Sequence, residues 1–226
     1  MLFSYASPIS RDFPELATQV LRIQGVTTQA CTAAAVDDLV ERARQRLAST
    51  PESELPEIQA WRRAFARMGL RPTQYRCASE ALLRRLRKEG ELPRLHPLVD
   101  LCNAASVAHA IPVAVIDLGR VQGCLRVGPA AGNELYETFA GETEHPQPGE
   151  IIFVDEAGRA HARRWCNRQS GHSAVTQHTA DALIVAEALH ATAGMDTGLL
   201  IAGIEAALSI SWPRAQVSRV VVQRSS

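Results

Sequence analysis

The sequence has 226 residues, which suits one large domain or a domain with a small appendage. Hydrophobic residues make up 46% and charged residues 21%, and 24 basic residues balance 24 acidic ones, so the overall charge identifies no class of partner. No stretch reaches the roughly 18 apolar residues that a membrane span needs, and the N-terminus does not look like a signal peptide. We therefore expect a cytoplasmic protein.

Helices dominate the first half of the chain. Residues 18–25 alternate in polarity, as a strand does. Apolar spacing, together with Gly and Pro at the expected ends, then predicts four helices, over residues 36–48, 55–68, 79–88 and 97–110.

The second half is richer in strands. Short apolar segments separated by Gly-containing turns predict strands at residues 113–116, 123–127, 150–154 and 160–165. Two helices and a closing strand complete the chain, at residues 181–191, 198–208 and 216–223. Helices segregated from strands predict an α+β fold rather than a regularly alternating α/β fold.

The cysteines argue against two classes of protein. They are odd in number and scattered, and none forms a Cys-x-x-Cys pair: Cys31, Cys77, Cys102, Cys124 and Cys166. This pattern is typical neither of a disulfide scaffold nor of a zinc site. We expect no metal and no cofactor, and we interpret Cys102 and Cys166 as buried, unreactive residues.

Positive charge is concentrated between Arg62 and Arg94. This segment holds ten basic residues against three acidic ones, and 23 of the 24 basic residues of the chain are arginine. Arginine matches phosphate oxygens well, so the segment is compatible with a nucleic-acid-binding face. A solvated helical surface explains the same pattern equally well, and both interpretations stay open.

Generic catalytic motifs are absent from the sequence. It has no Gly-rich phosphate loop, no Gly-x-Ser-x-Gly elbow, no His-Glu-x-x-His motif and no dinucleotide fingerprint. His172 and His178 lie six residues apart in a polar segment, which is weak evidence for a metal site. From generic motifs alone, the chain is an α+β domain with a basic helical face.

Three blocks of sequence together resemble one family. They are WRRAFARMGLRPTQYR (61–76) with SEALLRR (79–85); LVDLCN (98–103) continuing through Ile111-Pro112 to Asp117, Gly123 and Arg126; and RWCNRQ (164–169) with Gly171, His172, Ser173, Thr176, Thr179 and AEA (186–188). In order and spacing the blocks resemble the editing domain of the phenylalanyl-tRNA synthetase β subunit, the B3/B4 domain, and its free-standing members. On this basis residues 56–226 are identified as a B3/B4-like domain, with residues 1–55 as an N-terminal extension of the same domain.

The resemblance implies a fold and a function. The fold is a three-layer arrangement, a β-sandwich with helices on one side and a pocket between the layers. The function is that of a trans-editing hydrolase, a deacylase that binds aminoacyl-tRNA and removes a mischarged amino acid. Canavanine on tRNA-Arg is an attractive substrate, because a carboxylate pairs well with a guanidinium-like group. The oligomeric state is left open, with a monomer as the default.

The family motifs map onto particular residues. By resemblance, Asn103 lines the editing pocket and orients the ribose or the water, and Glu187 recognises the amino acid side chain. Further pocket residues would be Asp117, Asn167, Gly171, His172, Ser173, Thr176 and Thr179, and contacts to RNA would come from Arg76, Arg84, Arg85, Arg126 and Arg168. Each also has a structural interpretation: Asn103 within its helix, Glu187 as a surface acid, Asp117 in a turn, and the arginines in ion pairs.

Two features bear on the chemistry. Ala114 stands where the synthetase carries a histidine, so removal of tyrosine by the same contacts is not implied. An aminoacyl ester is already activated, so hydrolysis needs a positioned water and a stabilised oxyanion, which we expect the backbone of the Gly171 loop to provide. The alternatives are a noncatalytic RNA-binding module and a protein that binds a small amino acid derivative without RNA.

Overall fold

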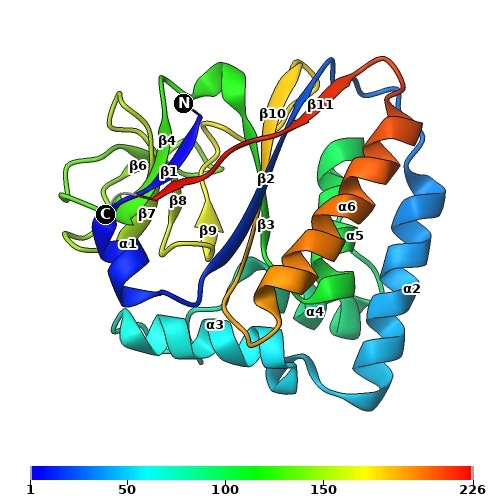
Figure 1. Ribbon diagram of the computed structural model, residues 1–226, viewed down its shortest axis with the longest axis horizontal. Helices are drawn as coiled ribbons and strands as arrows, with labels where there is room; N and C mark the ends of the chain where they lie inside the picture. Colours follow the sequence, from blue (N-terminus) through cyan, green and yellow to red (C-terminus); the bar gives the residue numbers. More distant parts are fainter. Residues whose placement is uncertain (1, 225–226) are drawn as a thin grey trace.

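The computed structural model describes residues 2–224, which form three layers (Figure 1). The α-helices are α1 (Ser7–Asp12), α2 (Ala33–Ser49), α3 (Pro56–Arg67), α4 (Ala78–Glu89), α5 (Pro97–His109) and α6 (Ala193–Ser211). The strands are β1 (Phe3–Tyr5), β2 (Ala17–Gln24), β3 (Val113–Asp117), β4 (Leu125–Pro129), β5 (Tyr136–Glu137), β6 (Thr143–Glu144), β7 (Ile151–Val154), β8 (Ala160–Arg163), β9 (Arg168–Gln169), β10 (Asp181–Ala188), β11 (Gln216–Arg219) and β12 (Gln223–Arg224).

Two sheets face each other, and helices cover one of them. The six-stranded sheet has the order β12-β1-β4-β7-β8-β9, and the four-stranded sheet has the order β11-β2-β10-β3. In Figure 1 the four-stranded sheet lies in the middle, with the six-stranded sheet on one side and α2, α4, α5 and α6 on the other. This arrangement confirms the predicted α+β class and its three layers.

The N-terminal segment contributes to both sheets. β1 lies between β12 and β4 and runs parallel to each, whereas β2 is a central strand of the four-stranded sheet. Phe3 and Tyr5 are fully buried, because both pack into the core between the sheets. One hydrophobic cluster runs from Phe3 to Trp212, and so the first strands share the core of the rest of the chain.

The prediction of a helix over residues 181–191 is wrong, because this segment forms β10. β10 pairs with β2 along its whole length and with β3 on its other side. Residues 182–188 are all buried, as expected of a strand covered on both faces. Such a strand shows no polar alternation, so its apolar, alanine-containing run has the same pattern as a buried helix.

Smaller differences concern element ends. The four helices predicted between residues 36 and 110 are confirmed as α2 to α5, and the predicted helix at 198–208 lies within the longer α6. The single predicted closing strand is two strands, β11 and β12, which belong to different sheets. The short elements β1, α1, β5, β6 and β9 have too few residues to show periodicity.

α6 also corrects the expectation about membrane spans. Its 19 residues are long and apolar enough to cross a membrane by length and composition, and among residues 2–224 it is the one helix that meets this test. Core helices meet the same test. α6 packs against β2 and β10, with Leu200, Ile201, Ile204 and Leu208 buried, and is therefore interpreted as a helix of the outer layer.

Candidate functional site

A small cavity lies between the two sheets. Its walls come from β3, β8 and β10 and from residues 165–169, and it has a volume of about 60 Å³. The polar side chains among its lining residues are His161, Asn167, Arg168, Gln169 and Glu187. A site of this size holds a few water molecules or the tip of a side chain, and it is smaller than the engineered cavity of about 150 Å³ that binds benzene.

Glu187 is the buried carboxylate of this cavity. It lies on the central strand β10, with only 2% of its surface exposed. Its Oε1 atom accepts hydrogen bonds from the Tyr5 hydroxyl at 2.5 Å and from the Trp165 indole N–H at 2.8 Å. Burial raises the pKa of Glu187 to about 7, although the bonds from Tyr5 and Trp165 favour its ionised form. Glu187 therefore changes its charge near neutral pH.

Trp165 reaches Glu187 from a strained turn. Arg164 and Trp165 have φ angles of 47° and 61°, so two consecutive residues with side chains adopt the left-handed conformation. This conformation costs roughly 1–2 kcal/mol for each such residue. Edge-on contacts with Phe13 and Trp61, at 4.9 and 5.1 Å between ring centroids, hold the buried Trp165 ring in place.

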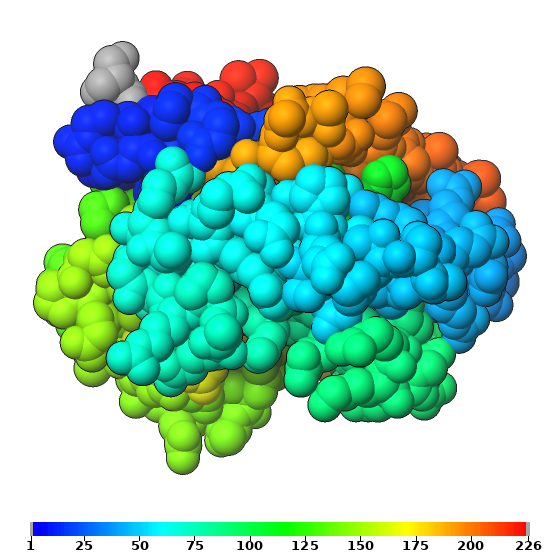
Figure 2. All heavy atoms as spheres, turned by 90° about the horizontal axis from the view of Figure 1, so that it is seen from below, coloured from blue at the N-terminus to red at the C-terminus, as the bar shows by residue number. Residues whose placement is uncertain are grey.

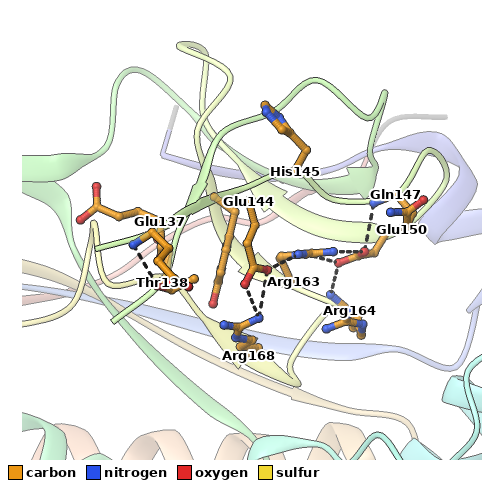
Figure 3. A network of polar contacts seen from close by, with 12 residues as sticks. Glu137, Thr138, Glu144, His145, Gln147, Glu150, Arg163, Arg164 and Arg168 are labelled. Carbon is orange, nitrogen blue, oxygen red and sulfur yellow. Dashed lines mark hydrogen bonds and ion pairs between the residues drawn. The ribbon is translucent and has the colours of Figure 1, made fainter. Parts of the chain in front are cut away.

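An ion-pair network holds the same turn from the outside (Figure 3). Glu150 accepts hydrogen bonds from the Arg163 guanidinium at 2.8 and 2.9 Å and from the Arg164 backbone N–H at 3.0 Å. Glu144 pairs with Arg163 at 2.5 Å and with Arg168 at 3.0 Å. Arg163 is almost fully buried, so this network fixes the backbone that presents Trp165 to Glu187.

Two amides face the cavity beside Glu187. Asn167 donates from Nδ2 to the carbonyl oxygen of Arg76 at 2.7 Å, and Gln169 donates from Nε2 to the carbonyl oxygen of Val115 at 2.7 Å. Each bond ties the segment 165–169 to a neighbouring element. Cys166 also lines the cavity, but burial raises the pKa of its thiol well above the usual value, so the thiolate that a nucleophile requires does not form.

The predicted loop from Gly171 to Thr179 lies outside the residues that line this cavity. The Gly171 N–H donates to the carbonyl oxygen of Glu137 at 2.9 Å, and the His172 N–H donates to the Ser170 hydroxyl at 3.2 Å. The Gly171 and His172 N–H groups are therefore already paired within the protein, so neither is free to bind an oxyanion in this arrangement. A Cβ atom at Gly171 would approach the Thr138 carbonyl oxygen to 2.7 Å, so close packing accounts for this glycine.

The rest of the loop holds Asp117. Thr179 donates from its hydroxyl to Asp117 Oδ2 at 2.7 Å and accepts from the Thr176 N–H at 2.9 Å. The Asp117 N–H donates to the carbonyl oxygen of Ser173 at 3.0 Å, and the Asp117 carboxylate accepts from Gly119 N at 2.9 Å. This cluster is thus a buried brace at the end of β3.

Asn103 belongs to a different layer. It lies on α5, which packs against α2, α4, α6 and β3 in the helical layer, and it does not line the cavity that contains Glu187. The structure therefore does not bring together the three groups expected to converge: Glu187 lies between the sheets, Asn103 lies in the helical layer and Gly171 lies in the loop beside β5.

The predicted RNA-contacting arginines are spread over several elements, and most are in ion pairs. Arg76 pairs with Glu80, Arg84 with Glu52, Arg85 with Glu89 and Arg168 with Glu144, whereas Arg126 is exposed on β4. Within the basic segment, the acids that pair with Arg67, Arg87 and Arg94 come from outside it: Glu15, Glu52 and Asp37. Three acids from neighbouring elements therefore offset part of the excess of seven positive charges in residues 62–94.

An open groove of about 600 Å³ adjoins the strained turn. Arg164, Arg67 and Tyr75 are among its lining residues, and the Arg164 guanidinium lies 4.7 Å from the centroid of the Tyr75 ring. Figure 2 shows this face, where the end of α3 and the following loop adjoin the segment around residue 148. Trp165 follows Arg164, so a single turn of the chain separates this groove from the cavity at Glu187.

Sequence reasoning singled out Glu187 and Asn167, which line this cavity, but not three of their neighbours. Tyr5 lies in the segment treated as an extension, Trp165 was given no role of its own within its sequence block, and His161 belongs to no motif. His161 belongs to β8 and is fully buried. Among residues 2–224, no three His, Cys, Asp or Glu side chains are grouped as a metal site would require.

The fold and site define an α+β domain with a buried carboxylate between two sheets and helices on one outer face. The model of the B3/4 domain family matches residues 60–199, so the chain belongs to the B3/4 domain family, as the sequence blocks predicted. The fold is similar to that of an N-terminal fragment of the phenylalanyl-tRNA synthetase β subunit from Pyrococcus horikoshii, with a TM-score of 0.51 and 9% sequence identity.

That match covers 99% of this chain and 52% of the fragment, so this chain spans about half of the fragment's length. At 9% identity the likeness establishes the fold alone. No curated protein sequence gives a significant match.

Proposed function

We propose that the protein is a trans-editing hydrolase, which removes the amino acid from mischarged aminoacyl-tRNA. One observation carries the proposal: the Glu187 carboxylate lines the cavity between the sheets, with Oε1 held by two donors and no hydrogen bond to Oε2 from the described residues. A carboxylate held in this way can bind a hydrogen-bond donor on a small ligand. Family membership supports aminoacyl-tRNA as the source of that ligand.

The geometry at Glu187 narrows the substrate class. Oε1 already accepts from Tyr5 and Trp165, so the two-point pairing of a carboxylate with a guanidinium is not open to Glu187. A side chain that offers a single donor to Oε2 suits the site better. The cavity of about 60 Å³ is also smaller than the roughly 150 Å³ of an engineered cavity that binds benzene, so we expect a slender side chain that ends in a hydrogen-bond donor.

With the amino acid side chain in the cavity, the ester and the RNA would lie at the outer side of the cavity. Hydrolysis of an activated ester needs a water held in line and donors at the developing oxyanion. Asn167 belongs to the lining of the cavity and is the amide that we expect to orient the water or the ribose. The groove at Arg164 and Tyr75 offers a guanidinium and an aromatic ring, the groups that bind unpaired nucleotides.

The test uses pairs of aminoacyl-tRNAs whose amino acids match in shape, threonyl with valyl and seryl with alanyl, together with canavanyl-tRNA-Arg. We expect the wild-type protein to hydrolyse the member that carries a side-chain donor at least about tenfold faster. Glu187→Gln keeps an acceptor for Tyr5 and Trp165 but turns an amide N–H toward the substrate, so the preference should collapse. Glu142→Gln, at an exposed glutamate, should change nothing. If no charged tRNA is hydrolysed faster than in buffer, the proposal fails.

A matched pair of asparagines tests the site itself. Asn167 lines the cavity, whereas Asn103, the residue indicated by the family motif, lies in the helical layer. If the cavity is the active site, Asn167→Ala slows deacylation by at least about tenfold and Asn103→Ala leaves it within twofold. The reverse result would move the site to the helical layer and restore the role that the family motif gives Asn103.

A second candidate is a binder of a free amino acid derivative without RNA. The ion pairs of Arg76, Arg84, Arg85 and Arg168 favour it, because a paired guanidinium is less available to phosphate. Binding of uncharged tRNA measured against salt separates the candidates. Phosphate contacts release counterions, so RNA binding should weaken steeply with salt, whereas a free derivative would bind with little salt dependence.

A further inference from the structure

His161 is a fully buried histidine that the motifs do not explain. It is 0% exposed, lines the same cavity as Glu187 and lies on β8, in the other sheet. The register between β7 and β8 shifts at His161: Phe153 pairs with Ala162 and the next residue, Val154, pairs with Ala160, so that His161 has no partner. His161 is the extra residue of this β-bulge. Bulges bend a strand and turn a side chain away from its regular direction, often beside an active site.

Asp155 holds one side of the imidazole. Its Oδ2 atom lies 3.3 Å from His161 Nε2. Asp155 is itself fixed by the backbone N–H groups of Gln122, Ala157 and Arg159, at 2.9, 3.0 and 2.9 Å. Burial alone would raise the pKa of Asp155, but the bonds from Gln122 and Arg159 hold it below the usual value. The carboxylate is therefore charged at neutral pH and orients the ring so that Nε2 faces it.

The imidazole has unused hydrogen-bonding capacity. Neither ring nitrogen of His161 makes a well-formed hydrogen bond with the described residues, because the contact to Asp155 has ion-pair distance without hydrogen-bond geometry. Leaving a buried polar group unpaired costs about 1–3 kcal/mol. Burial also lowers the pKa of His161, despite the neighbouring Asp155. The ring is neutral at neutral pH, and Nδ1 has no hydrogen-bond partner among the described residues.

We infer that His161, oriented by Asp155 and placed by the β7–β8 bulge, is the general base of the ester hydrolysis, an inference that rests on the proposed function. In the step, His161 Nδ1 takes a proton from water as the water oxygen bonds to the ester carbonyl carbon. The tetrahedral intermediate then breaks the carbon–oxygen bond to the ribose. His161 returns its proton to the ribose oxygen, and the products are the free amino acid and uncharged tRNA.

The first test is kinetic and uses the tRNA panel described above. His161→Gln removes the base but keeps hydrogen-bonding groups, and it should lower kcat by about 10²–10⁴-fold while KM stays within twofold. Asp155→Asn should lower kcat by at least about tenfold, because the ring loses the carboxylate that orients it. His178→Gln, at an exposed histidine, is the control and should have no effect. A kcat for His161→Gln within twofold of the wild type would overturn the inference.

The pH dependence gives a second signature. The charged and titratable groups around the imidazole are Asp155, Arg159 and His172, with Glu187 and Arg168 in the lining of the same cavity. Because protonation removes the base, kcat/KM should fall as the pH drops below the lowered pKa of His161. Glu187 also titrates, with a pKa of about 7. If the fall in kcat/KM at low pH persists in Glu187→Gln and disappears in His161→Gln, it is caused by protonation of His161.

Binding of an inert analogue separates failure of the inference from failure of the proposed function. The probe is adenosine that carries threonine through a 3′-amide, which cannot be hydrolysed as the ester is. In wild-type protein labelled with ¹⁵N-histidine, binding should shift the Nδ1 signal of His161 and leave that of His178 in place. Binding without this shift would overturn the role of His161 alone. Absence of both binding and deacylation would reject the proposed function, and with it the inference.

Discussion

Replacing Glu187 by glutamine should make the protein more stable at alkaline pH and leave its stability at acidic pH unchanged. The pKa of Glu187 is raised from 4.5 to about 7 by burial. Between these values the folded protein keeps the proton and the unfolded chain releases it, so stability falls as the pH rises through this window. Each tenfold change in acid dissociation is worth about 1.4 kcal/mol, and the total loss by pH 8 is therefore about 3 kcal/mol. Glutamine accepts the bonds from Tyr5 and Trp165 without this loss.

Urea unfolding at pH 4.5, 6 and 8, followed by tryptophan fluorescence, measures the effect. The free energies of unfolding of the wild type and Glu187→Gln should agree at pH 4.5 and differ by about 3 kcal/mol at pH 8, with glutamine the more stable. All other ionisable groups are shared, so their contributions cancel in the difference. Glu142→Gln, at an exposed position, should show no such divergence. A constant difference across the three pH values would refute the assignment of a raised pKa to Glu187.

Three further substitutions test the surroundings of the site, each by urea unfolding. Gly171→Ala should destabilise the protein by about 1–3 kcal/mol, because its Cβ would lie 2.7 Å from the Thr138 carbonyl oxygen; an unchanged midpoint would show that the loop adapts freely. Thr179→Val removes the 2.7 Å bond to buried Asp117 and should cost about 1.5–3 kcal/mol, and a loss below 0.5 kcal/mol would mean that water replaces the hydroxyl. Arg62→Met leaves the buried Glu80 without its 2.5 Å partner and should cost about 2 kcal/mol, whereas Arg63→Met, at an exposed arginine, should cost almost nothing; equal costs would contradict the ion-pair argument.

Helices on the surface were predictable from the sequence, and a buried strand was not. α3 and α4 have one apolar face and clear ends, such as Gly90 in the left-handed conformation after α4, so periodicity and capping locate them. β10 lacks that signal because sheet and helices bury both of its faces. Its alanines and its single leucine, isoleucine and valine fit either structure, and only pairing with β2 and β3 decides between them.

A site residue was predictable when it belongs to a family motif. Contacts between residues on elements far apart in the chain were not predictable. The family pattern singles out Glu187, which lines the cavity, but Tyr5 reaches Glu187 from 182 positions earlier in the chain. That contact exists because β1 inserts between β12 and β4, which no local pattern records. His161 depends on a bulge, and a shift of register by one residue is likewise invisible before the strands are paired.

Stability does not explain the groups that surround the cavity. The charged form of Glu187 costs the fold about 3 kcal/mol at alkaline pH, and glutamine would serve its two donors without that cost. The left-handed residues Arg164 and Trp165 add strain, and the ring nitrogens of His161 lack well-formed bonds. These unfavourable features come from two segments, residues 161–165 and the end of β10, and His161, Trp165 and Glu187 all line one cavity of about 60 Å³. Local departures from the rules of stable folding concentrate where a protein binds or reacts, and this convergence is the strongest physical reason to place the proposed site between the two sheets.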